Sequence, residues 1–169
     1  WRNLSYISRT ITTGGFATGV AAAKVVTTGA TTANQGIANQ ISTPVSGVAT
    51  NVALTNNLTY TVSFTVKGTA NFSTLDVVYS RDGTNTSTTA CATGRTVTQS
   101  VWTRINCDFT VPSSGVTTSN AIFIRQSDSN STARTFYIDN LSVTINANTN
   151  HAADGSADTG ASMGATSTF

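Results

Sequence analysis

The alternation of apolar and polar residues over runs of strand length is the feature of this sequence that most restricts its fold. The clearest run covers residues 60–67, where every second residue is apolar: Tyr60, Val62, Phe64 and Val66. A period of two is typical of a half-buried β-strand. Further runs of strand type follow: residues 74–80, 102–111, 120–127 and 134–145. Weaker runs precede them: residues 4–11, 20–27, 36–42 and 48–54. No helical period is evident, so the sequence predicts an all-β domain.

Composition agrees with this and excludes several functions. Threonine, serine and asparagine number 34, 19 and 15 of 169 residues, glutamate is absent, and charged residues are 9% against about 25% in typical domains. A net charge of +2 without a basic stripe argues against nucleic-acid binding. The apolar runs are too short to span a bilayer. A paired-Glu glycosidase is excluded, and the single His151 offers little for a catalytic triad.

Two cysteines, Cys91 and Cys107, lie 16 residues apart and flank two short strand-like runs. Two thiols at this spacing favour a disulfide over a metal site, which needs more ligands. A disulfide and the low lysine content indicate an extracellular or cell-surface location. The chain opens at Trp1 without an initiator methionine, as expected for a processed product or an excised part of a longer chain.

The sequence divides into a strand-rich part, residues 1–145, and a tail, residues 146–169, rich in alanine, glycine, serine and threonine. Residues 81–84 (Arg-Asp-Gly-Thr) predict a hairpin turn, and a slip in the apolar phase predicts a β-bulge near Asp139 and Asn140. The tail is interpreted either as a linker or as a strand that pairs onto a sheet edge. Its extended phase includes four apolar candidates for that pairing: Ala161, Met163, Ala165 and Phe169.

Several segments resemble carbohydrate-binding modules of families 4, 9 and 22. They are an early Trp1, LTYTVSFTVKG at 58–68, SVWTRINCDFTVP at 100–112, AIFIRQ at 121–126 and FYIDNLSVT at 136–144. The resemblance covers residues 1–145. It implies a jelly-roll β-sandwich of two antiparallel sheets, of the galactose-binding-like group. It also implies a non-catalytic role, with a polysaccharide or glycan as the partner.

The resemblance also exposes a departure at the N-terminus. Such modules begin with a strand upstream of the early tryptophan, whereas this chain starts at Trp1. The sandwich is therefore predicted to lack its own first strand, which would leave unpaired backbone groups at a sheet edge. As an alternative function, the tail would serve as a donor strand for another copy, in an extracellular filament or adhesin.

Sugar binding requires aromatic faces and planar polar groups. The candidates are Trp1, Tyr6, Tyr79, Arg81 and Arg125. Trp102 is expected to be structural. A set of polar residues is predicted to share one sheet surface, either as a binding face or as an ordinary solvated face: Thr65, Lys67, Asp76, Arg104, Asn106, Asp108 and Arg125.

In the resembling modules the residue matching Asp139 helps to hold a structural calcium ion. Calcium prefers six to eight oxygen ligands, and the acidic partner expected from the first strand is missing here. The alternative is that Asp139 caps the bulge by accepting backbone N–H groups. No set of residues marks a catalytic site, so the sequence predicts a protein that is not an enzyme.

Overall fold

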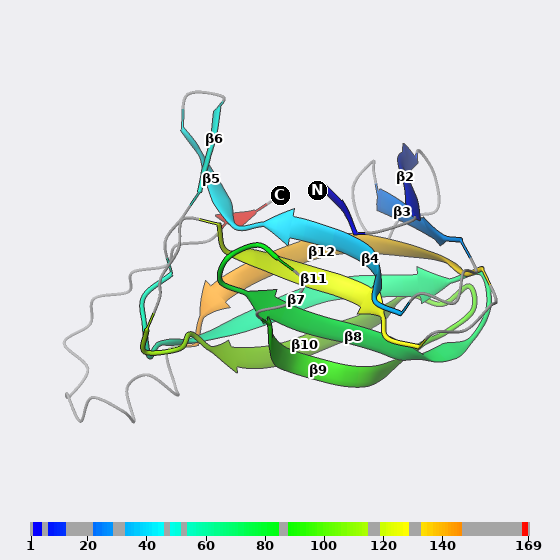
Figure 1. The fold of residues 1–169 in the computed structure, drawn as a ribbon. Helices are drawn as coiled ribbons and strands as arrows, with labels where there is room; N and C mark the ends of the chain where they lie inside the picture. The colour runs from blue at the N-terminus through cyan, green and yellow to red at the C-terminus, as the bar shows by residue number, and fades with distance from the viewer. Residues whose placement is uncertain are drawn as a thin grey trace.

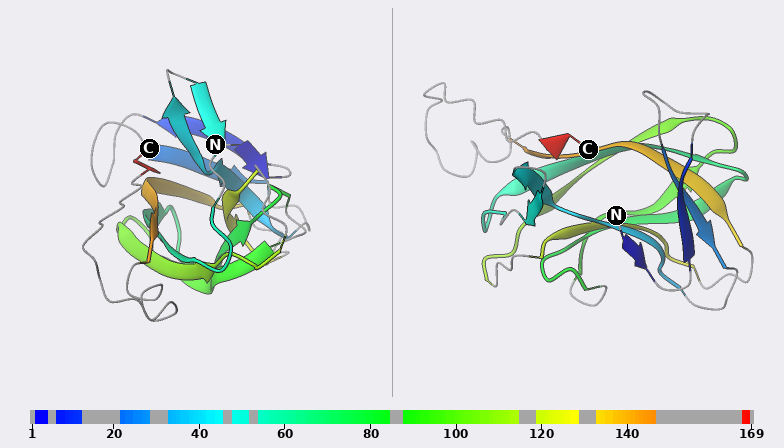
Figure 2. Two further views of the ribbon diagram at one scale, coloured as in Figure 1. Left: turned by 90° about the vertical axis from the view of Figure 1, so that its left-hand side faces the viewer. Right: turned by 90° about the horizontal axis from the view of Figure 1, so that it is seen from above.

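The computed structural model shows two antiparallel β-sheets packed face to face around one apolar core (Figures 1 and 2). It describes residues 2–4, 7–12, 22–28, 33–45, 48–51, 54–84, 88–114, 119–128, 133–146 and 167–168. No helix occurs within these ranges, and therefore none that could cross a membrane.

The five-stranded sheet has the order β1 (Arg2–Leu4), β4 (Gln35–Gln40), β11 (Ala121–Gln126), β8 (Phe72–Ser80), β9 (Thr88–Val97). The six-stranded sheet has the order β10 (Thr103–Thr110), β7 (Thr59–Gly68), β12 (Thr135–Ile145), β3 (Ala22–Thr27), β2 (Ile7–Thr12), with β13 (Ser167–Thr168) paired to β12. A separate hairpin consists of β5 (Ser42–Val45) and β6 (Val48–Asn51). From β3 to β12 the chain repeatedly crosses between the sheets, which confirms the predicted jelly-roll sandwich.

The core lies where the predicted apolar phases meet. In β10 the residues Ile105, Cys107 and Phe109 are buried and alternate with exposed neighbours. In β7 the residues Val62 and Phe64 are fully buried. Burial of the alternate apolar side chains of both sheets stabilises the sandwich, because it removes apolar surface from water.

The predicted β-bulge is present in β12. The register of β12 against β7 shifts between Asp139 and Ser142, and Asn140 has a φ of 55°. Before the bulge, β12 pairs with β3 through Thr135–Ile138.

The C-terminal tail contributes a strand to its own sandwich. Beyond the bulge, Ser142 and Val143 pair with Thr168 and Ser167 of β13 (Figure 2). Part of the tail is therefore placed on the β12 edge of the same chain. The residues predicted to drive self-assembly lie outside the described residues: Ala161, Met163, Ala165 and Phe169.

Two strand predictions need correction. The single run predicted at residues 4–11 is divided between β1 and β2, which belong to different sheets. β9 was not predicted as a strand, because its sequence TTACATGRTV has no clear apolar alternation.

The turn predicted at residues 81–84 is present: Asp82 Oδ1 accepts the N–H of Thr84 at 2.8 Å, and Gly83 has a φ of 68°.

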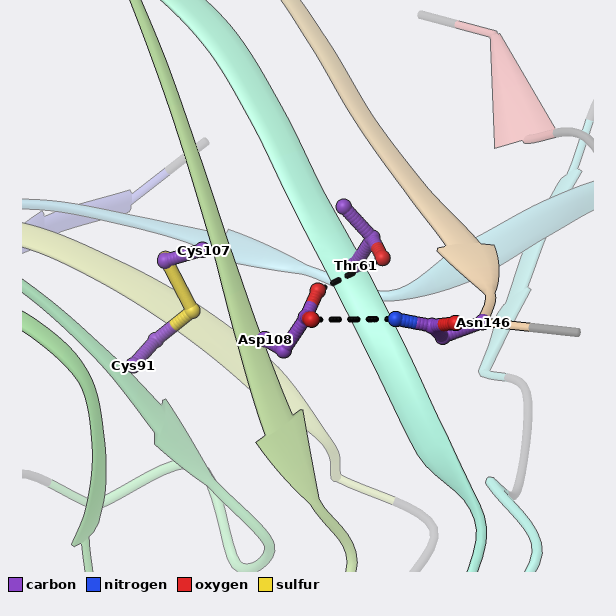
Figure 3. Close-up of a disulfide and its surroundings, with 5 residues drawn as sticks. All are labelled: Thr61, Cys91, Cys107, Asp108 and Asn146. Atoms are coloured by element: carbon purple, nitrogen blue, oxygen red, sulfur yellow. Dashed lines mark hydrogen bonds between the residues drawn. A yellow bond between two sulfur atoms is a disulfide. The ribbon is translucent and has the colours of Figure 1, made fainter. Parts of the chain in front are cut away.

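The predicted disulfide between Cys91 and Cys107 is confirmed, with a Cα–Cα distance of 5.4 Å (Figure 3). Cys91 lies on β9 and Cys107 on β10, which are edge strands of different sheets. The disulfide therefore links the two layers of the sandwich along one side.

Candidate functional site

The outer face of the five-stranded sheet carries a charged pair at its centre. Because Ile122 and Ile124 of β11 point into the core, Arg125 faces the opposite side. Arg125 is half-buried, and its register partner on β8 is Asp76, which is 9% exposed. Burial lowers the pKa of Arg125 and the charge of Asp76 raises it. The guanidinium nevertheless stays cationic, because arginine does not lose its proton in proteins.

On the neighbouring strand β4, the position beside Arg125 has no room for a side chain. Gly36 of β4 is the register partner of Arg125, and a Cβ at this position would lie 2.2 Å from the carbonyl oxygen of Ile124. That distance is far below a normal contact, so only glycine fits. The register row across the sheet at this point therefore runs from Gly36 through Arg125 to Asp76.

Apolar and polar side chains surround this pair on the same face. A small apolar cluster, separate from the main core, consists of Ala38, Val78, Ala121 and Phe123, which are all buried and so offer no surface to a ligand. Gln40 is exposed at the end of β4. Asp76 Oδ1 accepts the N–H of Gly94 at 2.9 Å, which fixes the carboxylate against the edge strand. A guanidinium, a carboxylate and an amide can all hydrogen-bond hydroxyl groups.

Two of the predicted sugar-binding aromatics, Trp1 and Tyr6, lie outside the described residues. The strand between them in sequence is β1, which forms an edge of the five-stranded sheet and pairs with β4. Arg125 lies on β11, the next strand in that sheet.

Tyr79 is a core residue, which corrects its interpretation as a sugar contact. It is 1% exposed, and its ring stacks on Phe109 with centroids 4.4 Å apart. Its hydroxyl donates to Asn120 Oδ1, and burial raises the pKa of Tyr79 to about 12. A ring covered in this way has no face available to a ligand.

Arg81 lies just beyond the end of β8 and donates from Nη1 to the carbonyl oxygen of Ser114 at 2.5 Å. It is five residues from Asp76, a span of about 17 Å along a strand. The structure therefore does not bring Arg81 and Arg125 into one site.

The polar residues predicted to share one surface belong to two surfaces. Asp76 and Arg125 face outward from the five-stranded sheet. The other five lie on β7 and β10 and face outward from the six-stranded sheet: Thr65, Lys67, Arg104, Asn106 and Asp108. The phase of each strand was predicted, but the sheet to which each strand belongs depends on long-range pairing.

Asp139 bonds to the bulge backbone, as the alternative interpretation predicted. Its Oδ1 accepts the N–H of Asn140 at 2.7 Å, and its carbonyl oxygen accepts the hydroxyl of Thr65 at 3.1 Å. Within the described ranges no group of three or more acidic, histidine or cysteine side chains is assembled. These side chains do not provide a calcium site by themselves, so a structural calcium ion stays a prediction.

The fold places the protein in the class of antiparallel β-sandwiches, and this sandwich carries a charged pair, Arg125 and Asp76, on the outer face of one sheet. The family model described as carbohydrate binding domain (CBM_4_9) matches residues 10–132, which is more than half of the chain. The chain belongs to this carbohydrate-binding family, which confirms the resemblance seen in the sequence. No curated protein matches the sequence.

Solved structures of carbohydrate-binding modules share the fold. The CBM22-1 xylan-binding domain of Paenibacillus barcinonensis Xyn10C aligns with a TM-score of 0.62 and 16% identity, over 86% of this chain and 85% of that one. The CBM22-1–GH10 modules of Clostridium thermocellum Xyn10B, complexed with xylohexaose, align with a TM-score of 0.60 and 18% identity, over 84% and 25%. A CBM4 structure aligns with a TM-score of 0.52 and 16% identity, over 73% and 83%.

Proposed function

We propose that this domain is a non-catalytic module that binds a neutral polysaccharide on the outer face of its five-stranded sheet, around Arg125 and Asp76. The match of the carbohydrate-binding family over residues 10–132 carries the proposal. The neighbours described as xylan-binding make xylan the first polysaccharide to test. The disulfide supports an oxidising, extracellular setting for the parent protein.

The chemistry of the pair suits a polyhydroxylated ligand. The guanidinium of Arg125 offers several donors in one plane, and the carboxylate of Asp76 is an acceptor held in place by Gly94. Hydrogen bonds to charged groups are stronger than neutral ones. The guanidinium of Arg125 is the more exposed of the two groups and would make the hydrogen bonds to sugar hydroxyls. The buried carboxylate of Asp76, directly opposite on β8, would hold the guanidinium by its charge.

Affinity gel electrophoresis tests this proposal. Native gels would contain xylan, a mixed-linkage β-glucan or a galactomannan, and retardation would be compared for the wild type and Arg125→Ala. Arg95→Ala is the matched control, because Arg95 is an exposed arginine on β9. We expect Arg125→Ala to lose most of the retardation and Arg95→Ala to keep it. Equal retardation of the wild type and a folded Arg125→Ala variant would contradict the proposed site.

The alternative function, a filament or adhesin subunit joined by strand exchange, has no support from the comparisons. The described part of the tail, β13, pairs with β12 of its own chain. The non-catalytic role is tested separately: incubation with the polysaccharide that is bound best should release no reducing sugar.

A further inference from the structure

Four side chains form a row across the outer face of the six-stranded sheet. Lys24 on β3 is the register partner of Tyr137 on β12, and Tyr137 is in turn the partner of Lys67 on β7. The ammonium of Lys67 lies 4.9 Å from the centre of the Trp102 ring and 5.5 Å from that of Tyr137. We call these four residues the cation–aromatic row: Lys24, Tyr137, Lys67 and Trp102.

The row concentrates two residue types that are scarce elsewhere. Lys24 and Lys67 are the two lysines in the whole sequence. Trp102 and Tyr137 are the aromatic residues of the described ranges that are not buried. The other described aromatics are buried: Tyr60, Phe64, Phe72, Tyr79, Phe109, Phe123 and Phe136.

A purely structural role explains only part of this row. Lys67 between two rings makes cation–π contacts that hold Trp102 against the sheet. Lys24 lies on the other side of Tyr137, two strands away from Lys67, which is about 10 Å at ordinary strand spacing. Holding Trp102 in place requires only Lys67 and does not require the ammonium group of Lys24.

The charges around the row leave it positive. Arg104, on β10, faces the same side and is exposed. Asp139 is the nearest acidic residue in register, since its partner on β7 is Thr65, and its carboxylate bonds to the Asn140 backbone.

The acidic residue on β10 is further along the face. Asp108 accepts hydrogen bonds from Thr61 and Asn146 at 2.6 and 2.9 Å (Figure 3). It is four residues from Arg104, or about 13 Å along the strand. Three cations and one nearby carboxylate favour an anionic ligand.

We propose that the cation–aromatic row is a second binding site, and that it binds an anionic polysaccharide. The exposed parts of Trp102 and Tyr137 pack against sugar rings, and Lys24 and Lys67 pair with carboxylate or sulfate groups. A row in which ring surfaces lie between the charges matches a chain of charged sugars better than a point anion. This face points away from Arg125, so the site is separate from the proposed neutral-polysaccharide site.

Affinity electrophoresis in three gels tests this site, with polygalacturonate as the carboxylated probe, heparin as the sulfated probe and xylan as the neutral probe. Lys24→Gln is the main variant, because Lys24 contributes no core packing. Arg125→Gln removes the same charge from the opposite face. We expect Lys24→Gln to weaken binding to one or both anionic polymers at least about threefold and to leave xylan retardation unchanged. Arg125→Gln should leave the anionic binding unchanged.

Several results would overturn the second site. The wild type could show no retardation by either anionic polymer, or Lys24→Gln and Arg125→Gln could weaken it equally, as net charge alone would. Trp102→Ala and Lys67→Gln could lower the unfolding midpoint without changing anionic binding, which would indicate that these residues have a purely structural role. Equal, Lys24-dependent retention by DNA or by anionic vesicles would indicate a general anion surface. If Lys24→Gln lost xylan binding and kept its binding to the anionic polymers, that result would overturn the second site and would also count against the Arg125 site.

Discussion

Reducing the Cys91–Cys107 disulfide should lower the free energy of unfolding by about 3 kcal/mol. The cross-link closes a loop over a sequence separation of 16 residues, and the loop-closure entropy of such a loop is worth about 3 kcal/mol at 25 °C. For a chain of this length that corresponds to a fall in Tm of roughly 6–12 °C. The effect should be concentrated where β9 and β10 meet, because these edge strands belong to different sheets.

Urea denaturation at equilibrium measures this effect in three forms: oxidised wild type, reduced wild type, and Cys91→Ala combined with Cys107→Ala. The reduced wild type keeps both side chains, so it isolates the cross-link. The double variant also loses the buried sulfur of Cys107, which is 8% exposed, and should be somewhat less stable than the reduced protein. If the oxidised and reduced forms differed by less than about 0.5 kcal/mol, the cross-link would not be constraining the unfolded chain as argued.

Three further predictions concern stability and the domain boundary. Gly36→Ala should destabilise the fold by about 1–3 kcal/mol or more, because its Cβ would meet the carbonyl oxygen of Ile124; an unchanged urea midpoint would contradict this. Burial raises the pKa of Tyr79 to about 12, so its stabilising contribution is complete below pH 10 and falls by about 2–3 kcal/mol towards pH 12. Tyr79→Phe should flatten this pH dependence, and an identical slope in both proteins would contradict the assignment. Deleting residues 147–169 should leave the sandwich folded but speed amide exchange around Val143, where β13 pairs; unfolding of the shortened chain would place the tail within the core domain.

The apolar alternation predicted the core because burial of one strand face is a local property. In β7 the four apolar residues that the period of two placed on one face are all buried: Tyr60, Val62, Phe64 and Val66. β9 was not predicted because its residues are small and polar, and they form a strand by pairing with β8. Such pairing joins residues distant in sequence and leaves no local pattern.

The candidate site was less predictable for the same reason. Tyr79 was predicted as a sugar contact, and it lies near the end of the strand predicted at residues 74–80. Only the packing of Phe109 and Asn120 around it shows that it is buried. Lys24 and Tyr137 could not be associated from the sequence, because their register depends on how β3 and β12 pair.

The central claim is that a polysaccharide binds on the outer face of the five-stranded sheet. Chemical-shift mapping by NMR tests it directly, by titrating the isotope-labelled protein with oligosaccharides of the neutral polysaccharide that retards it most. The account predicts that the largest backbone amide shifts fall on β4, β8 and β11 around Arg125. Largest shifts on β7, β12 and β3, or no shift at saturating oligosaccharide, would contradict it.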